Sequence, residues 1–166
     1  MRREAFHPAQ AQEVAAVFGR QGVDYMFIGK SGAILLGYPG TTQDVDVFPR
    51  KDPENGRRIV KALLELGFPV EAALESEIVR GKDFVQIKNG PFDIDLVFVP
   101  DGIESYDEAK SRIDLSSGFP VANLRDISKV SVPQIGHETP WNFRYSRPFE
   151  KLTSSRNARI FESLYE

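Results

Sequence analysis

The stretch that decides the fold runs from Tyr25 to Phe48 and reads YMFIGKSGAILLGYPGTTQDVDVF. It opens on the wholly apolar run Tyr25–Ile28, which is typical of a strand buried on both faces. Gly29–Gly32 interrupts the run, and Ala33–Leu36 then predicts a short helix that begins near Ser31. The stretch closes on Asp44–Phe48, where polar and apolar residues alternate as in a strand with two different faces.

Helical and hairpin patterns surround this stretch. Ala9–Arg20 and Glu54–Leu66 carry apolar residues at helical spacing, and each is followed by a glycine. Asp83–Lys88 alternates, Asn89-Gly90 predicts a two-residue turn, and Phe92–Val99 returns as the second strand of a hairpin. The pattern predicts an α+β fold, with a mixed central sheet and helices packed on it.

The rest of the chain carries weaker patterns. We expect one domain over residues 1–166. Its motif core, the part that contains the candidate functional motifs, spans about 10–100, and residues 101–166 form a C-terminal extension. In that extension the predicted elements are a charged helix at Ile103–Ile113, a short edge strand at Phe119–Ala122, a helix at Leu124–Val130, an irregular Pro-rich segment at Val132–Pro148 and a final helix from Phe149.

Composition excludes several classes of protein. Lys and Arg number 21 against 24 Asp and Glu, so the net charge of −3 lacks the cationic footprint of a protein built to grip nucleic acid. The absence of cysteine excludes disulfides, thiolate zinc sites and a cysteine nucleophile. No signal peptide or membrane-spanning run is visible, so we expect a soluble, cytoplasmic protein. His7 and His137 stand alone and are interpreted as surface or structural residues.

Two pairs of carboxylates carry the strongest chemical signal. Asp44 and Asp46 lie two apart on one predicted strand, and Asp93 and Asp95 lie two apart on another, so each pair shares a face. Neighbouring carboxylates repel unless a cation lies between them, and Mg²⁺ takes one or two carboxylates together with substrate phosphates. If the strands are neighbours, the pairs predict a site for one or two metal ions suited to phosphoryl or nucleotidyl transfer. The alternative is a solvated strand face.

A second signal is the turn Gly29-Lys30-Ser31 between the first strand and the short helix. Backbone N–H groups at such a turn bind phosphate, and Lys30 adds a formal charge. A plain strand-to-helix turn remains the alternative. A P-loop is excluded, because Asp24 stands where its first glycine belongs.

These residues together resemble the minimal nucleotidyltransferases of the DNA polymerase β superfamily, especially the small bacterial proteins of the abortive-infection and toxin–antitoxin kind. Ile28-Gly29 matches the opening of the family motif, Leu36–Thr42 (LGYPGTT) matches its turn, and Asp44 with Asp46 matches its acidic pair. Asp95, followed by Leu-Val-Phe, matches the third carboxylate of the family better than Asp93 does.

The resemblance implies the nucleotidyltransferase fold and transfer of a nucleoside monophosphate from an NTP to an acceptor hydroxyl, with release of pyrophosphate. It implies that Asp44, Asp46 and Asp95 hold Mg²⁺ or Mn²⁺, that Asp95 helps to deprotonate the acceptor, and that the Gly29 turn holds the triphosphate. The acceptor is left open among tRNA, a protein side chain and a small molecule, and an antitoxin partner is a further implication.

Two positions depart from the family pattern. Lys30 stands where a small residue is usual, and Gly40 stands where Arg is common. These departures favour one alternative, a non-catalytic member that acts as a nucleotide sensor or partner subunit. The other alternative is an unrelated metal-dependent phosphohydrolase.

In the irregular segment, Trp141, Arg144 and Arg147 are candidates for contacts with an acceptor or base, with a core-capping role as the alternative for Trp141.

Overall fold

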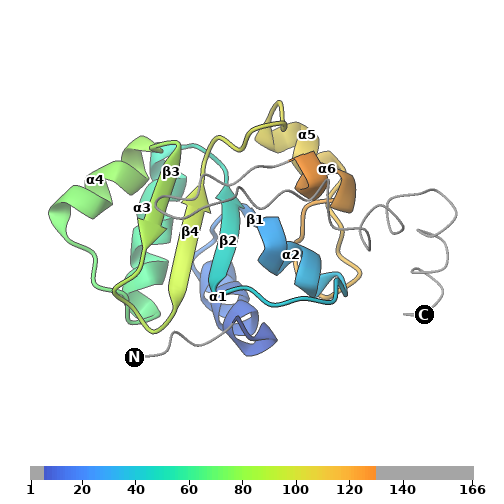
Figure 1. Ribbon diagram of the computed structural model, residues 1–166. Coiled ribbons are helices and arrows are strands. Elements are labelled where there is room, and N and C mark those ends of the chain that lie inside the picture. Colours follow the sequence, from blue (N-terminus) through green and yellow to red (C-terminus); the bar gives the residue numbers. More distant parts are fainter. Residues whose placement is uncertain (1–5, 130–166) are drawn as a thin grey trace, which may run out of the picture.

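A computed structural model gives the fold and describes residues 6–129 (Figure 1). The elements follow one another in the order α1 (Pro8–Arg20), β1 (Tyr25–Phe27), α2 (Gly29–Leu35), β2 (Asp44–Pro49), α3 (Pro53–Glu65), α4 (Ala72–Arg80), β3 (Phe84–Ile87), β4 (Asp93–Val97), α5 (Tyr106–Ser111) and α6 (Leu124–Lys129). The prediction of mixed helices and strands around one sheet is confirmed for these residues.

The sheet has four strands in the order β1-β2-β4-β3. The outer pairs, β1 with β2 and β3 with β4, are antiparallel, whereas the central strands β2 and β4 are parallel. The sheet is therefore mixed, as predicted. Because β2 and β4 lie side by side in the centre, the two acidic pairs occupy neighbouring strands.

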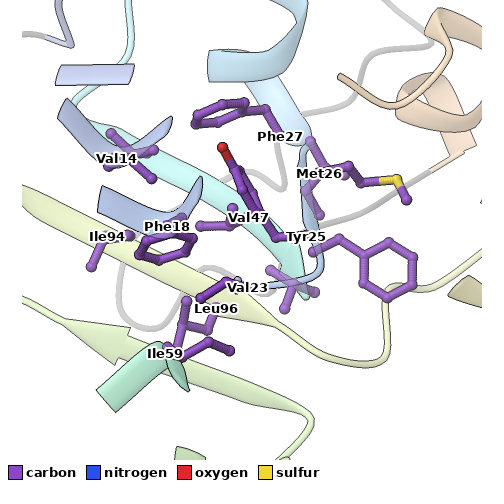
Figure 2. Packing of buried hydrophobic residues seen from close by; sticks show 14 of the residues in the cluster. Val14, Phe18, Val23, Tyr25, Met26, Phe27, Val47, Ile59, Ile94 and Leu96 are labelled. Atoms are coloured by element: carbon purple, nitrogen blue, oxygen red, sulfur yellow. The ribbon is translucent and has the colours of Figure 1, made fainter. Parts of the chain in front are cut away.

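One face of the sheet forms the hydrophobic core with α1 and α3. Figure 2 shows Val47, Ile94 and Leu96 of the central strands packed with Phe18 of α1 and Ile59 of α3, and all five side chains are buried. Apolar side chains at every second position of β2 and β4 supply this face. The carboxylates occupy the alternate positions and consequently lie on the opposite face.

The opposite face changes character along the strands. Beyond Asp46, Phe48 packs edge-on against Tyr106 of α5, with the ring centroids 5.2 Å apart.

On the outer side of β1, Phe27 exchanges backbone hydrogen bonds with Pro120 and Ala122. The predicted edge strand at 119–122 is thus a pair of isolated bridges rather than a full strand.

The structure corrects several predicted boundaries. The short helix begins at Gly29 rather than near Ser31, and the helix expected from Ile103 begins at Tyr106, where Ser105 caps it. Helix α4 was not predicted, because Ile78 is its single buried residue and gives no apolar stripe. The segment Val132–Pro148 and the final helix lie outside the described residues.

The predicted two-residue turn at Asn89-Gly90 is wrong. The strands pair Ile87 with Ile94, and residues 88–92 form the connection between β3 and β4. Gly90 instead leaves room for the Phe68 ring, because a Cβ built on it would lie 2.0 Å from Cδ1 of Phe68. None of the helices within 6–129 has the length and apolar character needed to cross a bilayer.

Candidate active site

The acidic pairs of β2 and β4 are in register with one another. Asp44 lies opposite Asp93, and Asp46 lies opposite Asp95, in the parallel pairing of the two strands. Register partners and residues two apart share a face of a sheet, so all four carboxylates lie on the face away from α1 and α3. Asp44, Asp46 and Asp95, the predicted metal ligands, are therefore brought together on adjacent strands.

The central two carboxylates are deeply buried. Asp46 is 6% exposed and Asp95 is 3% exposed. Burial raises the pKa of Asp46 well above its ordinary value, and the negative charges of Asp95 and Asp44 raise it further. Burial, with the charge of Asp44 next, raises the pKa of Asp95 to about 7, although Lys88 opposes the shift. The site therefore favours a bound proton or another cation.

Asp46 and Asp95 are joined by a side-chain hydrogen bond, which requires a proton on one of the two carboxyls. The other oxygen of Asp95, Oδ1, is buried and has no hydrogen-bond partner among the described residues. A buried carboxylate oxygen without a partner is costly, and a cation would satisfy it.

As the side chains stand, no three His, Cys, Asp or Glu residues within 6–129 are arranged to hold one metal ion. Asp46 and Asp95 are instead joined to each other by their side-chain hydrogen bond. Metal ligands must be deprotonated, so the shared proton has to leave before both side chains can ligate. The set of hard oxygen donors fits Mg²⁺ in its chemistry once that proton is lost.

The turn that follows β1 contacts Asp46 directly. Gly29 has a φ of +63°, and a Cβ built on it would lie 2.5 Å from Oδ2 of Asp46. Glycine is required here for two reasons, since L side chains rarely adopt this φ and the carboxylate occupies the space of a side chain. The predicted phosphate-binding turn and the predicted metal ligands thus belong to one site.

Ser31 occupies the interior of this turn and is fully buried. Its hydroxyl accepts a hydrogen bond from the Asp46 N–H at 2.9 Å and donates one to the Ile28 carbonyl at 3.2 Å. The side chain therefore ties α2 to β2.

Lys30 and Gly40, the two departures from the family pattern, lie next to each other. A Cβ built on Gly40 would lie 3.4 Å from Cε of Lys30 and 2.9 Å from Cε1 of Tyr38. The aliphatic stem of Lys30 thus lies beside the turn after α2, where a larger residue at position 40 would clash with it. Lys30 is half-buried and forms no ion pair within the described part of the chain.

Sequence reasoning missed two polar residues on the same face. Gln86 is the register partner of Asp95 on β3, and Lys88 follows it by two. The alternation of Asp83–Lys88 was the available signal, but only the register shows that its polar positions share a face with the carboxylates. Asp93, set aside in favour of Asp95, is also buried on this face.

Trp141, Arg144, Arg147 and His137 lie outside the described residues. His7 precedes α1 and accepts a hydrogen bond from the Ala9 N–H, so it caps that helix, in agreement with its structural interpretation. No family model matches the chain, and no curated protein does either.

Proposed function

We propose that the protein is a metal-dependent nucleotidyltransferase of the nucleotidyltransferase fold, which transfers a nucleoside monophosphate from an NTP such as ATP to an acceptor hydroxyl. The observation that carries the proposal is the parallel register of Asp44 with Asp93 and of Asp46 with Asp95, beside the turn at Gly29. Such a concentration of buried carboxylates is unfavourable for folding alone and becomes useful when cations bind.

In this proposal Asp44, Asp46 and Asp95 hold Mg²⁺ or Mn²⁺, which would neutralise charge on the phosphates during transfer. The backbone N–H groups of the turn at Gly29 would hold the triphosphate, and Lys30 would offset its negative charge as a point charge. The acceptor oxygen attacks the α-phosphorus, pyrophosphate leaves, and the hydroxyl proton passes to a carboxylate oxygen of Asp95. Ser31 supports the turn. We place the reaction in the cytoplasm, with tRNA, a protein or a small molecule as the acceptor.

One observation favours a second candidate function. The hydrogen bond between Asp46 and Asp95 leaves no ready-made set of three ligands within 6–129, and Lys30 and Gly40 alter the turn region. A non-catalytic protein that senses nucleotides, or that pairs with a partner such as an antitoxin, would retain the fold and tolerate both features.

The test is release of pyrophosphate from each NTP in Mg²⁺ or Mn²⁺, together with transfer of an α-phosphate label to material in a cell extract. We expect both in the wild type and neither in Asp46→Asn. Asp101→Asn, which changes an exposed carboxylate, should retain activity. Orthophosphate release without a labelled product would indicate a phosphohydrolase. Nucleotide binding without pyrophosphate release would indicate the non-catalytic protein.

A further inference from the structure

The turn from Ile28 to Ser31 contacts every polar group of Asp46. The Asp46 N–H donates to Ser31 Oγ at 2.9 Å, the Asp46 carbonyl accepts from the Ile28 N–H at 3.0 Å, and the carboxylate lies against Gly29. Both backbone groups and the side chain of one aspartate are thus fixed by four consecutive residues.

The need for Ser31 follows from the way β1 becomes α2. Met26 pairs with Phe48 and Phe27 with Val47, so Ile28 is the next residue opposite Asp46. In an antiparallel ladder such a pair exchanges both backbone hydrogen bonds. The Ile28 carbonyl, however, already accepts the helical hydrogen bond of the Gly32 N–H at 3.0 Å.

The Ser31 hydroxyl bridges the Asp46 N–H and the Ile28 carbonyl, which accepts from it in addition to the Gly32 N–H. It accepts from the Asp46 N–H and donates to the carbonyl. A chain of two hydrogen bonds thereby replaces the missing ladder bond, so β1 can turn into a helix while Asp46 keeps its backbone satisfied.

We infer that Ser31 is a positioning residue for the metal site: its hydroxyl fixes the backbone of Asp46 against the turn at Gly29, orients the Asp46 carboxylate and so sets the affinity for the divalent cation. This inference rests on the proposed function. It assigns Ser31 to the metal side of the site rather than to phosphate, because both hydrogen bonds of its buried hydroxyl go to the backbone of β2 and of the turn.

Calorimetric titration of the full chain with Mn²⁺ tests the inference. Ser31→Ala removes both hydrogen bonds of the hydroxyl and should weaken Mn²⁺ binding about tenfold, which corresponds to about 1.4 kcal/mol. Asn55→Ala is the matched control. Asn55 is also buried and also ties a helix to the strands, with hydrogen bonds to the backbone of Asp24 and Arg50, but it touches no carboxylate of the site.

The outcomes separate the inference from the function. Both variants should unfold at lower temperature, and only Ser31→Ala should lose Mn²⁺ affinity. Equal Mn²⁺ affinity in wild type and Ser31→Ala would overturn the inference and leave the proposed function standing. Absence of Mn²⁺ binding to the wild type would overturn both. If Ser31→Ala does not fold, Ser31→Cys keeps the size with a weaker acceptor, and an unchanged affinity in that variant would also overturn the inference.

Discussion

Asp46 of β2 lies opposite Asp95 of β4, and a hydrogen bond joins the two buried carboxyls. The parallel register fixes their approach, because the flanking pairs Val45 with Ile94 and Val47 with Leu96 are locked into the core on the other face. A shift of one residue would carry the carboxylates into that core. The apolar face therefore enforces a close contact between two acids that would otherwise separate.

The pair predicts an unusual dependence of stability on pH. The pKa of Asp95 is raised to about 7, chiefly by burial and then by the charge of Asp44. Between pH of about 4 and about 7 the folded chain therefore holds at least one proton that the unfolded chain has released, because the pKa of Asp46 is raised as well. The free energy of unfolding of the metal-free protein should fall as pH rises through this window, by up to about 1.4 kcal/mol per pH unit for one proton.

Urea unfolding at several pH values between 5 and 8 measures this slope. Asp95→Asn, which cannot ionise, should show a shallower slope than the wild type, whereas Asp101→Asn should retain the wild-type slope. The exposed carboxyls of Glu65 and Asp107 have lowered pKa values and change their charge below this window. A wild-type stability that is flat or rises from pH 5 to pH 8 would contradict the burial of a shared proton.

Gly29 provides a test of the contact with Asp46. Gly29→Ala and Gly22→Ala both place an alanine at positive φ, +63° and +70°, but open space surrounds Gly22, whereas Asp46 lies against Gly29. The φ strain alone should cost about 1 kcal/mol in each variant. In urea unfolding, Gly29→Ala should lower the free energy of unfolding at least twice as much as Gly22→Ala does. Equal losses would show that the carboxylate yields to a methyl group at no cost.

Lys30 should contribute to nucleotide affinity through its charge. Lys30→Ala should weaken NTP binding by about 1 to 3 kcal/mol, or roughly 5- to 150-fold, as measured by calorimetry in Mg²⁺. Lys61→Ala, a change at an exposed lysine of α3, should leave the affinity unchanged. Equal or tighter binding by Lys30→Gly would show instead that the lysine obstructs the turn.

Local patterns in the sequence were sufficient to predict the elements that build the site. The alternation of Asp44–Phe48 and of the strand at Asp95 predicted one acidic face, and the apolar run at Tyr25–Ile28 predicted β1. Both follow from the two-residue period of a strand, which needs no knowledge of the partner. The mixed character of the sheet followed from the order of strands, helices and hairpin.

Contacts between distant residues could not be predicted in this way. The hydrogen bond between Ser31 and the Asp46 N–H depends on which residue of β1 lies opposite Asp46. The shared face of Gln86 and Asp95 depends on the register of β3 with β4. Gly90 was interpreted as a turn residue because Asn-Gly favours one, yet its small size serves the Phe68 ring. In each case the physical cause is a packing partner far along the chain.

Thermal unfolding with and without millimolar Mg²⁺ and NTP tests the central claim most directly. At a ligand concentration about 100 times the dissociation constant, binding adds about 2.7 kcal/mol to the free energy of unfolding. This raises the Tm of a chain of this size by roughly 5 to 10 °C. We expect this rise in the wild type and its loss in Asp46→Asn, which without metal should be at least as stable because one buried acid is removed. An unchanged wild-type Tm, or an equal rise in Asp46→Asn, would contradict a metal and nucleotide site on the carboxylate face of β2 and β4.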